Sequence, residues 1–312
     1  TTGGTTSATR STVASVVVRS REVTYGHTDH HNAEYEIAEM LGEGGMGSVY
    51  RARQNSIDRS VALKMIKSGS VSSSNNDKFL TEAVITGDLE HPNIVPIYDL
   101  GSNASGDLFY AMKEVRGAPW RKTIDTASEE DNLEVLHKVA DAIAFSHSRG
   151  VLHRDLKPDN VMIGEFGEVL VMDWGLALPV GHFEKEGLAL SLGPCGTPAY
   201  MAPEMARQNG KVTTASDVYL LGAQLFRLAT GKAPHTAKSA RECLRAAARN
   251  EILEVERDDE LVAIARKAMS TRPEHRHATA QEFQAALGEY RSHKESRAMT
   301  ERAIEKLSNA RN

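Results

Sequence analysis

Two neighbouring stretches of the sequence constrain this chain more than any other feature: residues 153–160, His-Arg-Asp-Leu-Lys-Pro-Asp-Asn, and residues 173–175, Asp-Trp-Gly. The first acid, Asp155, is followed by an amide at Asn160 and by a second acid at Asp173. Carboxylate and amide oxygens are hard ligands that suit Mg²⁺, and a carboxylate can also accept the proton of a hydroxyl group. An Asp/Asn-rich stretch is often only a turn. Two acids and an amide together, however, suit a site that handles Mg-bound phosphates.

Three further motifs surround these stretches. Residues 42–49 read Gly-Glu-Gly-Gly-Met-Gly-Ser-Val, residues 61–64 read Val-Ala-Leu-Lys, and residues 202–204 read Ala-Pro-Glu. A GxGxxG pattern alone is weak evidence, because dinucleotide-binding folds share it at a turn between a strand and a helix. Here the β-prone residues 48–52 follow, so we expect a hairpin. Glycine lets backbone N–H groups approach phosphate oxygens without a Cβ in the way.

In this order and spacing, the five elements resemble the catalytic domain of a eukaryotic-like (Hanks-type) Ser/Thr protein kinase of the bacterial kind. The resemblance covers about residues 35–288. It implies an α+β, bilobal fold, with a small antiparallel-sheet lobe carrying one regulatory helix and a larger, mainly helical lobe. It also implies ATP and Mg²⁺ as cofactors and transfer of the γ-phosphate to Ser or Thr hydroxyls of protein substrates, with autophosphorylation in the activation loop.

The resemblance assigns catalytic roles to Asp155, Lys157, Asn160, Lys64 and Thr197. Asp155 would accept or orient the proton of the substrate hydroxyl, Lys157 would neutralise the γ-phosphate, and Thr197 would bridge these two residues. A lysine at position 157 resembles Ser/Thr kinases rather than tyrosine kinases. Asn160 and Asp173 would hold Mg²⁺.

Lys64 lies in an apolar run, where an inward-facing lysine needs a partner, although a strand lysine can also reach the surface. By resemblance it would contact the α- and β-phosphates and pair with a helix glutamate. Glu82 matches that glutamate better than Glu90, which falls near the expected helix end. The full set that the resemblance places at ATP is Leu41, Gly42, Gly44, Gly47, Val49, Ala62, Lys64, Glu82, Met112, Lys113 and Val115.

Within that set, Val49 would cover the adenine ring and Met112 would be the gatekeeper beside it. Backbone groups of Lys113 and Val115 would hydrogen-bond the base. Such bonds do not depend on side-chain identity, so this part of the alignment rests on position only.

The resemblance also marks regulatory and structural residues. Trp174 stands where the family usually has Phe, and we expect it to fill the same packing site and to shift the preference between active and inactive loop positions. Arg154 is the arginine that pairs with a phosphorylated loop residue in related enzymes. Ser191 is the only Ser or Thr between Asp173 and Thr197, which makes it our hypothesis for the autophosphorylation site.

Three residues resemble the internal supports of the large lobe. Asp217 would hold the backbone of the catalytic loop, and Glu204 and Arg276 would form a buried ion pair. Losing either partner of such a pair leaves a buried charge.

Composition narrows the partners and the compartment. The net charge of -5 gives no reason to expect a nucleic-acid partner. No apolar run approaches the roughly 20 residues that a membrane helix needs. Cys195 and Cys243 cannot form a disulfide framework, so we expect a reducing compartment, the cytoplasm. Because the chain starts Thr-Thr without Met, we expect a piece of a longer protein that could carry a membrane anchor elsewhere.

We expect three regions along the chain. Residues 1–33 would be a flexible Ser/Thr-rich arm, with residues 13–18 apolar enough to pair as a strand or to contact a partner. Residues 34–288 would be the kinase domain, divided at 115/116 into its two lobes. Residues 289–312 would be a helical extension, either a solvated linker helix or a coiled coil that makes a homodimer. The arm's histidines, His27, His30 and His31, could bind a metal, but a solvated linker is the simpler interpretation.

Helical periodicity predicts helices over 78–89 (with Asp77 as cap), 133–148, 215–230 and 260–270, and apolar runs predict strands over 94–100, 108–115 and 169–172. Two alternative functions remain open. A pseudokinase that acts as an ATP-binding scaffold usually lacks Lys64, Asp155 or Asp173, which are all present. A small-molecule phosphotransferase tends to lose Ala-Pro-Glu and the threonine, which are also present.

Overall fold

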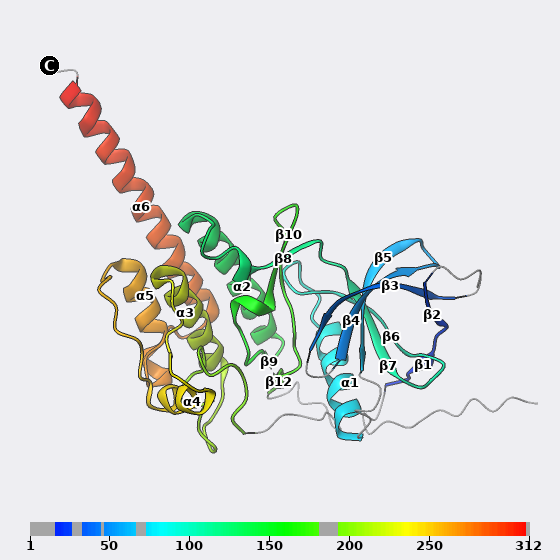
Figure 1. Ribbon diagram of the computed structural model, residues 1–312. Helices are drawn as coiled ribbons and strands as arrows, with labels where there is room; N and C mark the ends of the chain where they lie inside the picture. The colour runs from blue at the N-terminus through cyan, green and yellow to red at the C-terminus, as the bar shows by residue number, and fades with distance from the viewer. Residues whose placement is uncertain (1–15, 27–32, 45–46, 67–72, 181–192, 310–312) are drawn as a thin grey trace, which may run out of the picture. The chain divides into compact units, whose positions relative to one another are not determined.

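The structure is a computed structural model that describes residues 16–26, 33–44, 47–66, 73–180 and 193–309. The chain divides into two compact units. Unit 1 comprises Thr1–Ala118, Arg149–Val151 and Met162–Ser191, and unit 2 comprises Pro119–Ser148, Leu152–Val161 and Leu192–Asn312. Strands dominate the described part of unit 1, and helices dominate that of unit 2 (Figure 1).

A seven-stranded sheet with the order β1-β6-β7-β5-β4-β3-β2 forms the centre of unit 1 (Figure 1). Its strands are β1 Arg19–Ser20, β2 Val23–Tyr25, β3 Tyr35–Glu43, β4 Gly47–Gln54, β5 Arg59–Ile66, β6 Ile97–Ser102 and β7 Leu108–Lys113. The five longer strands pair antiparallel, and the sequence of the first three alternates apolar and polar residues over 35–65. Leu63 and Phe109, both fully buried, belong to an apolar cluster of the sheet.

Part of the expected flexible arm belongs to this sheet. β1 pairs parallel with β6, and β2 pairs parallel with β3. Strands of two and three residues are too short to leave a periodic signal, so they are not visible in this Ser/Thr-rich stretch. Val16 and Val18, from the apolar patch at 13–18, pack against the core of unit 1. The histidines at 27, 30 and 31 lie outside the described residues.

One helix, α1 (Ser73–Gly87), packs on the sheet (Figure 1). It begins five residues before the predicted start at Lys78, so Asp77 lies inside the helix rather than capping it. The Ser and Asn residues of its first turns are weak helix formers, but they add to a helix that Phe79, Leu80 and Ala83 already anchor in the core. Gly87 ends the helix before Leu89.

The remaining strands are short. β10 (Val161–Gly164) lies between β11 (Val169–Val171) and β8 (Gly117–Pro119), and β12 (Leu178–Pro179) pairs with β9 (Val151–Leu152). The buried strand predicted at 169–172 is present as β11. The strand predicted at 94–100 starts three residues later, as β6, and β7 ends two residues before the predicted Val115.

Unit 2 is built from α2 (Glu129–Ser148), α3 (Thr214–Thr230), α4 (Ala240–Arg249), α5 (Glu260–Ala268) and α6 (Ala280–Asn309), with short 3-10 turns η1 (Trp120–Lys122), η2 (Pro158–Asn160) and η4 (Pro273–His275). α2 starts four residues before the prediction, because three acidic residues in its first turn favour the helix N-terminus. α3 matches the prediction to within one residue. Thr213 and Ser216 form its capping box, and Gly231, with a φ of 73°, ends it.

The predicted C-terminal helix is longer than the sequence pattern indicated. α6 begins at Ala280 and runs through Gly288, so it crosses the expected domain boundary without a break. A glycine inside a helix costs about 1 kcal/mol relative to alanine, which packing of the flanking Leu287 and Tyr290 offsets. Met299 and Ile304 are 68% and 61% exposed, and the side chain of Leu307 lies outside the described residues.

No described helix is long and apolar enough to cross a membrane. Nor does the described part of the chain hold a group of three or more His, Cys, Asp or Glu side chains placed for a metal ion. Cys195 and Cys243 are both free thiols, as the sequence led us to expect.

Candidate active site

In unit 1, Lys64 on β5 and Glu82 on α1 form an ion pair. The Lys64 Nζ lies 2.7 and 2.9 Å from the two carboxylate oxygens of Glu82. Glu82 is 2% exposed, so its charge would be costly without this partner. The hydroxyl of Tyr110, on β7, donates a third hydrogen bond to the same carboxylate at 2.8 Å. Glu90, the weaker candidate, lies exposed beyond the end of α1.

Burial raises the pKa of Tyr110 well above its usual value, and the negative charges of Glu82 and Asp173 add to this effect. The Tyr110 hydroxyl therefore stays protonated and remains a hydrogen-bond donor to Glu82 at every physiological pH. Glu82 is thus held in place by two donors, a lysine and a tyrosine.

The glycine-rich stretch connects β3 and β4 as a hairpin, as expected. Gly42 pairs with Val49, and the Gly44 N–H donates to the Gly47 carbonyl at 2.8 Å. A Cβ on Gly47 would lie 2.2 Å from the Met65 carbonyl oxygen, so β5 itself requires a glycine here. A Cβ on Gly42 would meet no described atom within 4 Å, and one on Gly44 would meet only the Gly47 carbonyl, at 3.8 Å.

Gly42 and Gly44 also lack a positive φ, so neither packing nor conformation in the described structure explains them. The room that they leave at the turn fits an external group that approaches the backbone closely, such as a phosphate. Residues 45–46, at the tip of the hairpin, lie outside the described residues.

Three of the residues expected around the adenine, Val49, Ala62 and Met112, come together in one apolar cluster. Ala62 pairs with Met112 across β5 and β7, both are buried, and Val49 packs against the same cluster. Lys113 ends β7 and pairs with Val61, and Val115 lies two residues further along the chain. Leu41, on β3, is 44% exposed. An apolar surface bordered by an exposed strand end suits a flat aromatic base.

Asp173 lies beside Glu82 within unit 1. A Cβ placed on Gly175 would come within 3.3 Å of an Asp173 carboxylate oxygen and 3.4 Å of a Glu82 carboxylate oxygen. Gly175 therefore allows the chain to bring two carboxylates close together. Asp173 itself has a φ of 58°, a strained conformation for a residue other than glycine, which is common at functional sites. Trp174 is 1% exposed, as expected for a residue that fills a packing site.

In unit 2, four of the predicted catalytic side chains form one hydrogen-bonded network. Lys157 Nζ donates to an Asp155 carboxylate oxygen and to the Thr197 hydroxyl, both at 2.8 Å. The Thr197 hydroxyl donates to the other Asp155 oxygen at 2.7 Å. The Asn160 amide donates to the Asp155 carbonyl at 2.8 Å and to its carboxylate at 3.1 Å. These bonds fix the orientation of the Asp155 carboxylate.

Asp217 holds the backbone just before Asp155. Its carboxylate accepts hydrogen bonds from the N–H groups of His153 and Arg154, at 2.8 and 2.9 Å, and lies 2.9 Å from His147 Nε2. Burial alone would raise the pKa of Asp217, but the hydrogen bonds that its carboxylate makes with His147 and with the Arg154 backbone help to lower it overall. These contacts hold Arg154 in a left-handed conformation with a φ of 67°.

The segment that carries Thr197 passes close to the catalytic loop. Gly196 has a φ of 115°, and a Cβ there would lie 2.7 Å from the Arg154 carbonyl oxygen, so only glycine fits. The Arg154 side chain is buried, and this burial lowers its pKa. Burial also disfavours the charged form of the neighbouring Cys195, so it raises the pKa of this thiol. Cys195 therefore stays protonated, which is the unreactive form. Ser191 lies outside the described residues.

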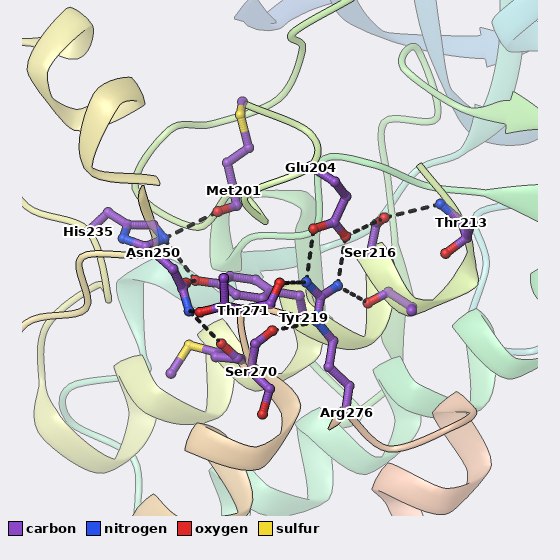
Figure 2. Close-up of polar contacts among 12 residues, drawn as sticks. Met201, Glu204, Thr213, Ser216, Tyr219, His235, Asn250, Ser270, Thr271 and Arg276 are labelled. Carbon is purple, nitrogen blue, oxygen red and sulfur yellow. Dashed lines mark hydrogen bonds and ion pairs between the residues drawn. The ribbon is translucent and has the colours of Figure 1, made fainter. Parts of the chain in front are cut away.

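Glu204 and Arg276 form the expected buried ion pair (Figure 2). Arg276 donates from its two terminal nitrogens to the two Glu204 oxygens at 2.7 and 2.9 Å, and Ser216 donates to Glu204 at 2.8 Å. The guanidinium also donates to the backbone carbonyls of Ala215 and Ser270. Although burial raises the pKa of Glu204, the bonds from Arg276 lower it overall.

Comparison with known proteins decides which family this geometry belongs to. The family model described as "Protein kinase domain" matches residues 35–305. The chain belongs to the protein kinase domain family. The predicted α+β, bilobal fold, with a small sheet lobe and a larger helical lobe, is therefore confirmed.

The curated relatives of this kinase domain include bacterial proteins named serine/threonine-protein kinase PknD. The PknD of Protochlamydia amoebophila is 37% identical over 230 residues, which cover 64% of this chain and 23% of that protein. The PknD of Chlamydia trachomatis serovar D is 32% identical over 294 residues, covering 82% of this chain and 31% of that protein. The PknD of Chlamydia felis is 33% identical over 240 residues, 67% of this chain and 25% of that protein. The kinase domain thus corresponds to about a quarter to a third of these relatives.

Sequence reasoning missed three polar residues that support the kinase site. Tyr110 orients Glu82, and His147 bonds Asp217. His235 contacts the segment that follows Thr197: its backbone N–H donates to the Ala199 carbonyl at 3.1 Å, and its ring lies 3.2 Å from the Met201 carbonyl (Figure 2). These three residues give no signal of their own in the sequence, because each contacts a partner that lies far away along the chain.

Proposed function

We propose that this kinase domain transfers the γ-phosphate of ATP to Ser or Thr hydroxyl groups of proteins, with Mg²⁺ as cofactor. The observation that carries the proposal is the hydrogen-bonded set of Asp155, Lys157 and Thr197. The closed Lys64–Glu82 pair supports it, because in protein kinases this pair has to be in place for catalysis. Membership of the family and the names of the relatives support the same reaction class.

In this mechanism Asp155 orients the substrate hydroxyl and accepts its proton. Its carboxylate is already fixed by Thr197 and Lys157, so little reorganisation is needed when the substrate binds. The ammonium group of Lys157 lies within 2.8 Å of Asp155, where its charge offsets the negative charge of the phosphoryl group in transfer. Catalysis in such a site is mostly positioning and electrostatics.

The nucleotide would be held by unit 1. Lys64, fixed by Glu82, would contact the α- and β-phosphates, and the backbone at Gly42 and Gly44 has the room that phosphates need. When bound, Mg²⁺ would supply positive charge that offsets the negative charge of the phosphates. Asp173 and Asn160 would hold it: the Asn160 amide nitrogen is committed to Asp155, which leaves the amide oxygen as the ligand atom.

Regulation would act through Ser191, Arg154 and Trp174. A phosphate on Ser191 would add about 1.5–2 negative charges, and by the resemblance it would pair with the Arg154 guanidinium. Trp174, larger than the usual Phe, would change the balance between active and inactive positions of the loop.

The remaining proposals concern the surroundings of the domain. Two free thiols support a reducing compartment such as the cytoplasm. The net charge of -5 supports protein rather than nucleic-acid partners. The exposed Met299 and Ile304 support a homodimer through the end of α6.

The test is transfer of labelled γ-phosphate from Mg-ATP to the chain and to a generic basic protein. Asp155→Asn keeps the shape of the side chain but removes the base, so it should lose transfer while keeping ATP binding. Asp258→Asn, a matched change at a side chain that is 80% exposed, should act as wild type. Phosphoamino-acid analysis should show phosphoserine or phosphothreonine. A folded, ATP-binding wild type without transfer would support the scaffold alternative, and phosphotyrosine would contradict the acceptor class.

A further inference from the structure

One short segment near the N-terminus covers both edges of the main sheet of unit 1. Residues 16–26, the strap, carry β1 and β2 with only Arg21 and Glu22 between them. In β1, Arg19 and Ser20 pair with Gly101 and Ser102 of β6. β2 pairs over its whole length with β3, from the register of Val23 with Tyr35 onward. The strap thus joins the two strands that would otherwise be the open edges of a five-stranded sheet.

Arg21 fastens the strap where it crosses from one edge to the other. Its guanidinium donates two hydrogen bonds to the Asp99 carboxylate on β6, both at 3.0 Å, and lies 3.2 Å from Glu34. Tyr35, the first residue of β3, donates its hydroxyl to the same Asp99 carboxylate at 3.0 Å. The hydrogen bond with Asp99 raises the pKa of Arg21, although burial opposes it. One carboxylate therefore connects the strap with both edge strands.

Backbone contacts show that the fit is close. The Arg21 N–H donates to the Ser102 carbonyl at 2.8 Å, and the Glu22 carbonyl accepts from the N–H groups of Glu34 and Tyr35. A Cβ on Gly101 would lie 2.8 Å from the Arg21 side chain and 3.0 Å from the Arg19 carbonyl oxygen. Gly101 has no positive φ, so the glycine is required by the space that the strap and the neighbouring Phe109 ring occupy.

The strap also reaches the core under α1. Val16 and Val18 pack against the buried cluster to which α1 contributes Phe79, Leu80 and Ala83. Glu82, the partner of Lys64, lies on the same turns of α1 as these apolar residues. The part of the chain matched by the kinase family model begins only at residue 35, so the strap lies outside it.

We infer that the strap is a positioning segment for catalysis, which holds α1 and thereby keeps Glu82 paired with Lys64. The inference rests on the proposed kinase function, because its readout is phosphotransfer. Residues before the family-matched region then set how much of the protein has the Lys64–Glu82 pair. Loss of the strap removes Val16 and Val18 from the core and opens both sheet edges, and α1 loses part of its support.

Two deletions give a matched comparison. Removal of residues 1–15 leaves the strap intact and should leave kcat and the KM for ATP as in the full chain. Removal of residues 1–26 takes the strap away and should lower kcat by about tenfold, within the usual range of coupling between sites. A synthetic peptide of residues 16–26, added in trans, should restore most of the lost activity. Equal kcat for the two deletions would overturn the inference.

A charge exchange keeps the test decisive if the longer deletion fails to fold. Arg21→Glu and Asp99→Arg should each lower activity and raise hydrogen exchange in α1, and the double variant should restore both. Additive losses in the double variant would contradict a role for this pair. Hydrogen exchange separates this inference from the proposed function. If the full chain transfers no phosphate but loss of the strap still raises hydrogen exchange in α1, the proposed function is wrong and the contact between the strap and the α1 core is supported. If the chain transfers phosphate and hydrogen exchange in α1 is the same with and without the strap, only the inference about the strap is wrong.

Discussion

Replacing Arg276 by methionine should destabilise unit 2 strongly, because it leaves Glu204 charged, 9% exposed and bonded only through Ser216 and the backbone. Breaking a buried ion pair by removing one partner costs about 3–5 kcal/mol. The same change leaves the Ala215 and Ser270 carbonyls without their bonds from the guanidinium. We therefore expect the upper half of that range.

The assay is thermal unfolding followed by circular dichroism. For a domain of this size, each kcal/mol shifts Tm by roughly 2–4 °C, so a loss of about 4–5 kcal/mol should lower Tm by about 8–20 °C. Arg272→Met, a matched change at an exposed position four residues earlier, should shift Tm by little. Arg276→Lys should lie between the two, because a lysine keeps the charge but cannot donate the paired bonds.

The pH dependence gives a second signature. In the wild type the pKa of Glu204 is lowered, so its contribution to stability is present above the ordinary pKa of about 4.5 and is lost as pH falls below it. In Arg276→Met, burial without the guanidinium raises that pKa, and protonation then removes the uncompensated charge. The Tm difference between variant and wild type should narrow from about pH 7 to about pH 5. A loss no larger than that of Arg272→Met, or one that does not narrow, would refute the reasoning.

Three further predictions concern the nucleotide, pH and phosphorylation. Gly47→Ala should lower stability, because the new Cβ would lie 2.2 Å from the Met65 carbonyl oxygen. Gly42→Ala, which meets no described atom within 4 Å, should keep stability but weaken ATP binding. Thermal unfolding with and without Mg-ATP distinguishes the two effects. Burial lowers the pKa of His235, so the stability that the neutral ring contributes is lost as pH falls below about 6.5. His235→Phe should therefore reduce the decrease in unfolding free energy below this pH. The same decrease in the variant as in wild type would count against this prediction. Peptide mapping after incubation with Mg-ATP should find phosphate on Ser191, and its absence from an active sample would exclude that site.

The side chains of the candidate site were easier to place from the sequence than the ends of the helices and strands, for a physical reason. The chemistry depends on side chains at fixed spacing, such as Asp155 with Lys157 and Asn160, and that spacing is visible in the sequence. The network that fixes Asp155 includes Thr197, which the resemblance alone supplied. Tyr110 could not be found in this way, because its hydrogen bond to Glu82 joins positions 28 residues apart.

Element boundaries were missed where local signals were weak. The starts of α1 and α2 lie several residues before the predicted ones, because the first turns are polar and lie outside the apolar periodicity. β1 and β2 are too short to show an alternating pattern, and their place in the sheet depends on partners in β6 and β3. α6 continues through Gly288 because tertiary packing outweighs the weak helix propensity of one glycine.

The most direct test of the central claim is intact-mass analysis of the chain after incubation with Mg-ATP, alongside Asp173→Ala. Phosphoryl transfer depends on the Asp173 carboxylate in our account, and the fold does not. Wild type should gain phosphate on serine or threonine, and Asp173→Ala should gain none while its unfolding transition stays close to that of wild type. A wild type that binds Mg-ATP and gains no phosphate, on itself or on a basic protein, would contradict the account.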